Sequence, residues 1–362
     1  MPSPIMTTNS PYLHVSYAET NRVLAEPYQR IVVAAIVAAV VCIPFVAGGY
    51  FLHLMNLCSI AVIGAVGINL LTGYCGQLSL GQASFLAIGA FTTAILSQRF
   101  GVPFFLAIPA SCCAGAVVGF VVGLPALRFR GIYLAITTLA MHYAIIYVLT
   151  NYQAIVGPSA SAGISVPAPS LGGFTLNSER GWFYVLLIVA ALVVMFALNL
   201  SRTYIGRAWV AIRDRDIAAE TSGINVPRYK LLAFTISAAL AALAGSLGAY
   251  FTTVVTVEEY TLELAIVYLA MIIVGGMGSV IGSVLGAVFI TLLPFGVARI
   301  FEAFPWQLGT TAFGVQQAAI GFAIIGFLLF EPDGLIEIYR RIATYFERWP
   351  FRYRELRAGG SR

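Results

Sequence analysis

The sequence predicts an all-α, polytopic membrane protein with about ten transmembrane helices. Its 362 residues are 60% hydrophobic and 10% charged, with a mean hydropathy of +0.90, whereas soluble proteins are about 25% charged. Many apolar runs reach or approach the ~20 residues that cross ~30 Å of hydrocarbon. A single long interior segment, residues 201–230, is strongly charged. These observations divide the chain into membrane-spanning halves joined by an aqueous loop.

The apolar runs, bounded by Gly, Pro and polar residues, place the individual spans. The expected spans lie near residues 31–48, 50–71, 81–98, 104–125, 132–150, 182–200, 231–254, 263–276, 280–296 and 313–330. A polar tail, 1–29, precedes this transmembrane domain of residues 30–335, and a basic tail, 336–362, follows it. Within the domain, residues 151–181 form the longest loop on the opposite side from 201–230.

The distribution of basic residues predicts the orientation. With the N-terminus in the cytoplasm, 17 of the 20 Lys and Arg residues fall on the cytoplasmic side, and only Arg99, Arg180 and Arg299 fall outside. Basic residues concentrate on the inner side of membrane proteins. We therefore expect both termini and the loop 201–230 in the cytoplasm, and the loop 151–181 and the acidic residues Glu258, Glu259 and Glu263 outside.

The loop 201–230 cannot lie in hydrocarbon, where each central Arg or Asp costs roughly 2.5 to 3.5 kcal/mol. A short helix is expected over Ala208–Glu220, ended by Gly223 and followed by Pro227. Composition alone leaves two interpretations open. The loop is either an ordinary solvated basic connection or the surface through which a separate motor protein acts on this chain.

Two glycine-rich stretches interrupt apolar runs at corresponding places in the two halves: residues 73–82, GYCGQLSLGQ, and residues 275–286, GGMGSVIGSVLG. Non-helical backbone at membrane depth must be buried in protein or line a cavity, and paired broken segments indicate a substrate path. Under the expected topology the two halves are inverted repeats. The candidate path residues are Gly73, Gly76, Gln77, Ser79, Gln82, Gly275, Gly276 and Gly278. A role of these glycines in helix crossing alone remains the alternative.

Several function classes are disfavoured or excluded. The single lysine, Lys230, rules out a GxxxxGK[ST] phosphate loop, and no catalytic constellation, metal-ligand spacing or CxxC pair is present, so we expect no enzyme activity, metal or cofactor. The basic loops account for the net charge of +5, which removes the argument for nucleic-acid binding. The spans carry almost no charge, whereas ion-coupled carriers usually need a buried ionisable group. Energy is therefore expected from a partner ATPase.

Five sequence blocks, in order, resemble the branched-chain amino acid ABC transporter permeases. They are GYCGQLSLGQASFLAIGAF, GLPALRFRGIYLAITTLA, GRAWVAIRDRDIAAETSGINVPRYKLLAFTISAALAALAG, GGMGSVIGSVLGAVFITLLP and FEPDGL. The resemblance implies a permease in a bacterial inner membrane that works with two ATP-binding subunits, a second homologous permease and an external solute-binding protein. It also implies a coupling helix over Ala208–Gly223. The coupling candidates are Gly206, Arg213, Ala219, Glu220 and Gly223.

The solute is less constrained than the family. The outer loop at Val156–Gly173 carries no charge, unlike the acidic or amide-containing loop frequent in the family, so a urea or short-chain amide importer remains an alternative. An ion-coupled carrier or a channel is the alternative of a different class. Charge complementarity to a binding protein singles out Glu258, Glu259, Arg99 and Arg180 on the outer side.

Overall fold

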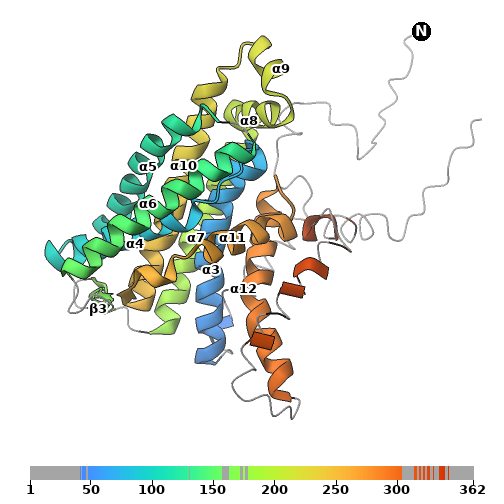
Figure 1. Ribbon diagram of the computed structural model, residues 1–362. Coiled ribbons are helices and arrows are strands. Elements are labelled where there is room, and N and C mark those ends of the chain that lie inside the picture. The colour runs from blue at the N-terminus through green and yellow to red at the C-terminus, as the bar shows by residue number, and fades with distance from the viewer. Residues whose placement is uncertain are drawn as a thin grey trace, which may run out of the picture. The chain divides into compact units, whose positions relative to one another are not determined.

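The computed structural model describes residues 41, 43–45, 48–129, 131–156, 163–171, 174–175, 178–303 and isolated positions between 314 and 341 (Figure 1). The chain divides into two units, Met1–Leu52 and His53–Arg362. All side-chain contacts discussed for this protein lie within the second unit. The expected spans at 31–48 and 313–330 lie largely outside the described residues, as do the tails 1–29 and 336–362.

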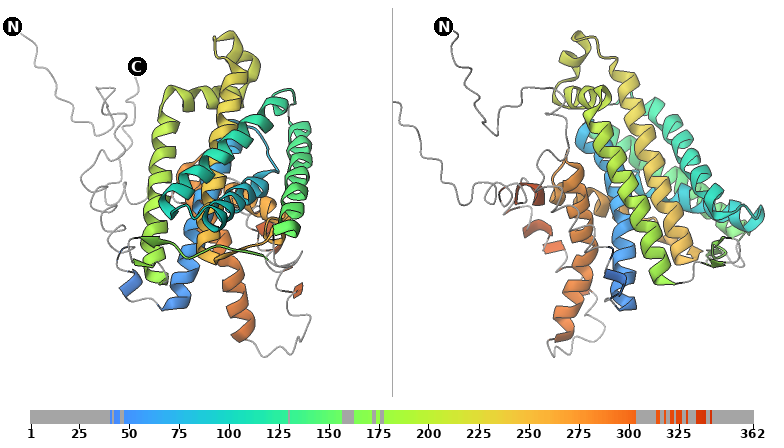
Figure 2. Two further views of the ribbon diagram at one scale, coloured as in Figure 1. Left: turned by 90° about the vertical axis from the view of Figure 1, so that its left-hand side faces the viewer. Right: turned by 180° about the vertical axis from the view of Figure 1, so that it is seen from behind.

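The described elements are almost all helical. They are α3 (Gly49–Ile68), the π-helix η1 (Asn69–Tyr74), α4 (Gln82–Arg99), α5 (Phe104–Ala126), α6 (Ile132–Val156), β1 (Ile164–Ser165), β2 (Ser170–Leu171), β3 (Phe174–Thr175), α7 (Glu179–Arg202), α8 (Tyr204–Asp214), α9 (Asp216–Thr221), α10 (Val226–Thr252), β4 (Val254–Val255), the 3₁₀-helix η2 (Val257–Glu259), α11 (Leu262–Gly275) and α12 (Val280–Ala303). In Figures 1 and 2, α8 and α9 lie at one end of α7 and α10, and β3 lies toward the other end.

Within the described residues, six helical segments are long and apolar enough to cross a membrane: 49–74, 104–126, 132–156, 179–202, 226–252 and 280–299. The expectation of ten spans is therefore confirmed only in part. Two expected spans form helices that do not qualify. α11 has 14 residues, about 21 Å at 1.5 Å per residue. α4 has 18 residues and is mostly buried among other helices, which removes the need for a strongly apolar surface.

The centre of the unit is α10, which packs against α4 and α5. Small residues make this close packing possible, because a side chain at Gly89 of α4 would collide with the backbone of Ala242, and one at Gly119 of α5 would collide with Ala238. A buried hydroxyl cluster joins the same three helices: Thr93 Oγ1 lies 2.7 Å from Ser111 Oγ and 2.6 Å from Ser246 Oγ. Glycines and hydroxyls therefore hold together a core in which hydrocarbon provides no hydrophobic driving force.

Two short strand pairs lie in the connections between helices. β1 pairs antiparallel with β4, with Ile164 opposite Val255, and β2 pairs with β3. Val166 N–H also donates to Thr253 O at 2.8 Å. The all-α expectation missed these strands because each has two residues, too few for an alternating pattern. The β1–β4 pair connects the loop before α7 to the segment after α10, whereas β2 and β3 both lie within that loop.

Candidate functional site

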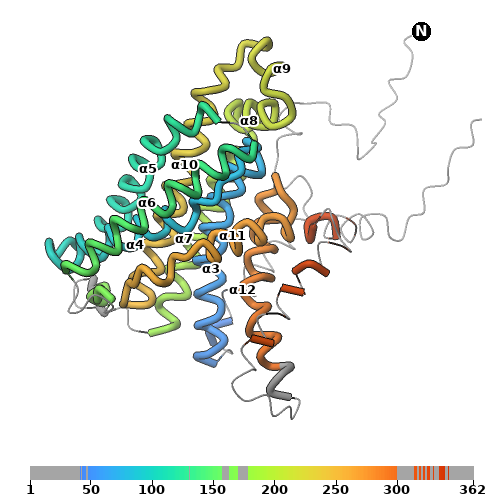
Figure 3. Tube along the Cα trace, viewed as in Figure 1, coloured from blue at the N-terminus to red at the C-terminus, as the bar shows by residue number. Residues whose placement is uncertain are grey.

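The loop 201–230 folds into two helices rather than the single helix expected over Ala208–Glu220. α8 ends at Asp214, Arg215 adopts an extended conformation with φ −157° and ψ 111°, and α9 then runs from Asp216 to Thr221. The sequence RDRD contains neither Gly nor Pro, so it carries no signal for this break. The expected end is confirmed: Gly223 has φ +83°, and its N–H donates to Glu220 O at 3.0 Å. Figure 3 shows the path of the chain through both helices.

Two contacts fix this loop on the start of α10. Trp209 of α8 is fully buried, and its Nε1 donates to Tyr229 O at 2.9 Å. Lys230 Nζ donates to Asp216 Oδ2 at 2.6 Å, with only 14% and 22% of the two side chains exposed. Gly206 and Ala219 are buried as well, and a side chain at Gly206 would collide with the backbone of Ser201. The loop is thus a packed structure and not a loose connection.

Arg213 reaches from α8 to both glycine-rich stretches. Its Nη1 donates to Gly73 O at 2.7 Å, its aliphatic stem lies against Gly76, and a side chain at Gly278 would collide with Nη1. Gly76 and Gly278 have φ values of +71° and +79°, so glycine is favoured there twice, by conformation and by space. Arg213 therefore joins the charged loop to the broken segments of both halves.

Asn69, which was not among the sequence candidates, holds the two broken segments together. Its Nδ2 donates to Ser279 O at 2.9 Å, and its Oδ1 accepts from Gly278 N–H at 3.0 Å. Asn69 is completely buried at the start of the π-helix. The available signal was an amide inside the apolar run before Gly73, because a buried amide in a membrane span needs partners.

The segment after the π-helix is also fixed by hydrogen bonds. Gln77 N–H donates to Leu71 O at 3.1 Å, Thr72 Oγ1 donates to Gln77 O at 3.0 Å, and Leu80 N–H donates to Thr138 Oγ1 at 3.0 Å. The irregular backbone is thus satisfied inside the protein, as non-helical chain at membrane depth requires.

The structure places the candidate path residues in different surroundings. Gln82 Nε2 donates to Gly64 O at 3.0 Å, and Ser79 Oγ accepts from Gly81 N–H at 3.3 Å, so both are engaged inside the protein. Gly275 packs against the backbone of Gly282, a helix-crossing contact between α11 and α12. Gly276 has φ +108°, and the chain at Gly334, in the FEPDGL block, lies against it. Gln77 alone of these side chains is buried with an amide oxygen that has no partner among the described residues.

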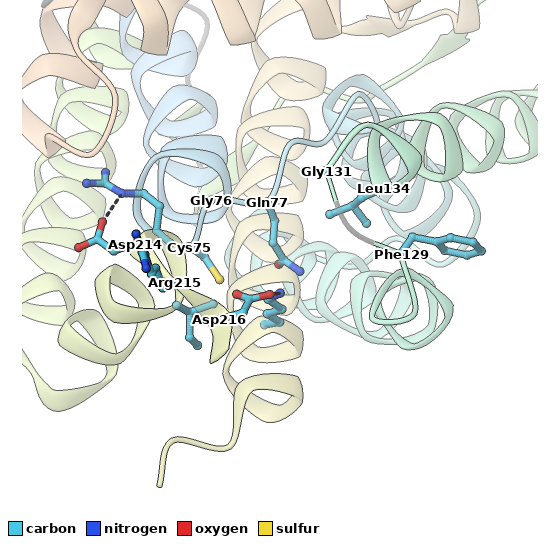
Figure 4. A pocket seen from close by; sticks show the side chains of 12 residues that line it. Cys75, Gly76, Gln77, Phe129, Gly131, Leu134, Asp214, Arg215 and Asp216 are labelled. Carbon is cyan, nitrogen blue, oxygen red and sulfur yellow. Dashed lines mark hydrogen bonds and ion pairs between the residues drawn. The ribbon is translucent and has the colours of Figure 1, made fainter. Parts of the chain in front are cut away.

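A cavity of about 230 Å³ lies where the loop meets the first broken segment (Figure 4). Its lining residues are Cys75, Gly76, Gln77, Phe129, Gly131, Leu134, Ile212, Arg213, Asp214, Arg215, Asp216 and Lys230. Ligand pockets usually measure about 300–1,000 Å³. Its small volume and mixed charge suit a mechanical junction better than a small-molecule site.

The four outer candidates do not form one cluster of contacts. The Arg99 guanidinium lies over the Tyr152 ring, 5.7 Å from its centroid, and Arg180 is exposed in the first turn of α7. Glu258 and Glu259 lie together in η2. Desolvation and, second, the charge of Glu258 raise the pKa of Glu259 above its ordinary value.

The buried broken segments, the apolar spanning helices and the packed charged loop define the class: a multi-pass membrane protein. Residues 50–328 match the family described as branched-chain amino acid transport system, permease component. The chain belongs to this family, and it is thus a permease component of the ABC transporter class. No solved structure matches the chain significantly.

Curated relatives carry different solutes in their names. The chain is 34% identical over 337 residues to the high-affinity branched-chain amino acid transport system permease protein LivM of Escherichia coli (strain K12), covering 86% of this chain and 76% of the relative. It is 28% identical over 302 residues to the galactose/methyl galactoside import permease protein MglC of the same organism, covering 76% of this chain and 86% of the relative. These relatives are transport permease subunits, and they leave the solute open.

Proposed function

We propose that this chain is the membrane-spanning subunit of an ATP-driven importer for branched-chain or related aliphatic amino acids in a bacterial inner membrane. The contacts of Arg213 carry the proposal. One side chain of the charged loop touches Gly73, Gly76 and Gly278, so a displacement of α8 is transmitted to both broken segments. Energy released outside the membrane thereby reaches the solute path.

The remaining features fit this assignment. In the proposed orientation both termini and the loop 201–230 face the cytoplasm, where two ATP-binding subunits act. A second homologous permease and an external binding protein complete the complex. Ile217 on α9 is 72% exposed, and Glu220 and Gly223 are exposed beside it. These residues lie in the segment Ala208–Gly223 that the family resemblance assigns to the coupling helix, so α9 is the proposed docking surface.

The sequence suggested Arg213 as a coupling residue, and its contacts support a positioning role instead. Its guanidinium is directed inward to Gly73 O, and its Nε lies 3.7 Å from Asp214 Oδ1. It therefore positions the broken segments behind the docking surface, while Ile217 and Glu220 make the contact with the ATPase.

The solute assignment rests on the relatives. The LivM relative covers the greatest share of this chain among those described, which favours amino acids over the sugar named for MglC. A urea or short-chain amide importer of the same family is the alternative. An ion-coupled carrier is less favoured, because the buried polar residues in the described part of the chain include one histidine, His142, but no Asp, Glu, Lys or Arg.

Reconstituted vesicles test the proposal. The complete complex is inserted with its binding protein, and uptake of labelled leucine is compared between wild-type ATPase subunits and subunits that bind but do not hydrolyse ATP. We expect uptake to stop without hydrolysis. Uptake that continues on a sodium or proton gradient would refute the proposal, and uptake of urea or galactose in place of leucine would refute its solute assignment.

A further inference from the structure

The FEPDGL block, residues 330–335, is a family-like stretch to which the proposed function gives no role. Within it Gly334 is buried, and a short helical segment, residues 335–338, follows directly. Ile336 of this segment is 8% exposed, and Leu335 packs against the hydrophobic core. The C-terminal segment 334–338 is therefore anchored in the folded unit and is more than a loose start of the basic tail.

Gly334 touches the backbone of the second broken segment. A side-chain carbon added to Gly334 would lie 2.7 Å from Gly276 N, 2.8 Å from Gly276 Cα and 2.9 Å from Val274 O. All three are backbone atoms, which cannot rotate out of the way as the end of a flexible side chain does. The two segments thus meet backbone to backbone, at a separation that leaves no room for a methyl group.

Gly276 is the pivot between α11 and α12. Its N–H donates to Ile272 O at 3.0 Å and to Ile273 O at 3.2 Å, which ends α11. Gly276 has φ +108° and Gly334 has φ +79°, so both lie in the left-handed region that favours glycine. A contact on Gly276 therefore acts where the chain turns from one helix of this pair into the next.

Arg213 reaches the same broken segment from α8. Its Nη1 lies where a side chain at Gly278 would be, two residues after Gly276, and the Gly278 N–H donates to Asn69 Oδ1 at 3.0 Å. The segment 276–278 is thus contacted at one end by the C-terminal segment and at the other by the charged loop. A push at Gly278 turns α12 relative to α11 when Gly276 is held, whereas an unsupported segment would follow α8 as a whole.

We propose that Gly334 is a positioning residue for transport. It holds Gly276 in place, so that a displacement of α8, carried by Arg213 to Gly278, rotates α12 against α11. The proposal rests on the proposed function, because it takes the displacement of α8 to come from an ATP-driven partner. It goes further by giving a second segment, more than 100 residues from the loop 201–230 in sequence, a part in the coupling.

Gly334→Ala tests the contact, because the added methyl group collides with the backbone at Gly276 and displaces the C-terminal segment. The complete complex is reconstituted in proteoliposomes with its binding protein, and uptake of labelled leucine and hydrolysis of ATP are measured together. We expect uptake per ATP hydrolysed to fall about 5-fold or more, the lower end of coupling effects between protein sites. A purely structural role would reduce the amount of assembled complex, and with it both rates, but would leave their ratio unchanged.

Two further variants separate the contact from backbone strain. Gly101→Ala is the matched control, because Gly101 has φ +59° and nothing lies within 4 Å of an added side chain, and it should keep the wild-type ratio. Ile336→Ala adds no collision but removes a buried anchor of the C-terminal segment, so it should lower the ratio in the same direction. If Gly334→Ala does not assemble, Ile336→Ala decides. A wild-type ratio in Ile336→Ala, or an equal loss in Gly101→Ala, would overturn the proposal.

A double variant tests whether both residues act on the same segment. When Arg213→Met has already cut the link to Gly278, the loss of the support at Gly276 should cost little more, so we expect the double variant to match the weaker of the two single variants. A fall equal to the product of the two single effects would show that the residues act independently, and would overturn the proposal.

The two proposals fail in different ways. ATP-coupled uptake by the wild type with an unchanged ratio in Gly334→Ala refutes the role of Gly334 and leaves the importer assignment in place. Hydrogen exchange of the complex in nanodiscs gives a measurement that does not depend on transport. The Gly276 N–H should exchange about 5-fold or more faster in Gly334→Ala, since its hydrogen bonds lose their support. Equal exchange overturns the proposal, and faster exchange with ATP-independent uptake refutes the importer assignment alone.

Discussion

The two ends of α10 differ in how they use their polar groups. At the start of α10, Lys230, Trp209 and Arg213 all have partners at 2.6–2.9 Å, and the cavity there measures about 230 Å³. At the end of α10, a cavity of about 460 Å³ lies between α6 and the start of α11, and the buried His142 Nδ1 has no described partner. One buried oxygen beside the start of α10, Gln77 Oε1, also lacks a described partner, but the paired groups around it form a network, and a hydrogen-bonded network is rigid and transmits motion. The difference suggests that motion is transmitted at the start of α10.

The largest effect is expected from a substitution of Arg213, which links the start of α10 to the two broken segments. Arg213→Met keeps the aliphatic stem beside Gly76 but removes the donor to Gly73 O. Coupling between sites in proteins is typically worth roughly 5- to 150-fold, so we expect leucine uptake per ATP hydrolysed to fall by a factor in that range. Uptake and hydrolysis are measured together in proteoliposomes.

Arg228→Met is the matched control, because Arg228 is exposed and its backbone N–H, which the variant retains, donates to Asn225 Oδ1. This control should retain the wild-type ratio. Wild-type coupling in Arg213→Met would remove Arg213 from the transmission path.

A second substitution tests α9, the proposed docking surface for the ATP-binding subunits. Ile217→Asp places a charge on the exposed side chain of α9, and a buried interface anchor is worth about 2 kcal/mol or more. We expect the ATP-binding subunits to bind the permease about 30-fold more weakly, measured by titration in detergent. Ile217→Val should bind nearly as the wild type does. Equal affinity in the Asp variant would place the contact elsewhere.

A third substitution loosens the junction between the two broken segments. Asn69→Leu preserves volume but leaves the N–H of Gly278 and the carbonyl of Ser279 without their partner. We expect the free energy of unfolding to fall by about 2 kcal/mol, measured by denaturant titration in detergent micelles. The control is Asn151→Leu, since Asn151 is exposed and, among the described residues, bonds within its own helix, to Tyr147 O. Equal stability of both variants would show that the junction is not held by Asn69.

The smallest effect is expected at the end of α10. Gln153→Leu removes one acceptor, that of Val257 N–H, and leaves the β1–β4 pairing in place. We expect a loss of about 1 kcal/mol in the free energy of unfolding, measured by the same denaturant titration, because this bond no longer holds η2 against α6. The ratio of leucine uptake to ATP hydrolysis should stay at the wild-type value. Unchanged stability would mean that this contact does not hold η2, and uncoupled ATP hydrolysis would contradict the division between the two ends.

Much of the fold followed from local patterns. The apolar runs located eight of the described helices to within a few residues at most ends, and the glycine stop at Gly223 was correct. The break at Arg215 was missed because RDRD contains neither Gly nor Pro, and the contact beside the break, Lys230 to Asp216, joins residues 14 positions apart. The helices α4 and α11 have the expected lengths but are not long and apolar enough to count as spans, since a helix surrounded by protein need not meet the requirements of lipid.

The site residues also differ in whether the sequence alone could identify them. Arg213, Gly73, Gly76 and Gly278 were selected from three separate stretches, and the structure brings them together. Asn69 was not selected as a site residue, because a single polar residue in an apolar run does not reveal its partner. Gln82 and Gly275, by contrast, were selected for a path and lie in packing contacts.

The sequence by itself determined the membrane class, the family and the charged loop, because hydropathy, charge and glycine placement are local properties that each segment carries alone. Only the tertiary structure decided that Arg213 points inward, that one amide joins segments about 210 residues apart, and that Gly334 lies against Gly276. Hydrogen bonds depend on distances of about 3 Å and on direction, and the folded chain sets these between residues whose order in the sequence does not specify that they meet.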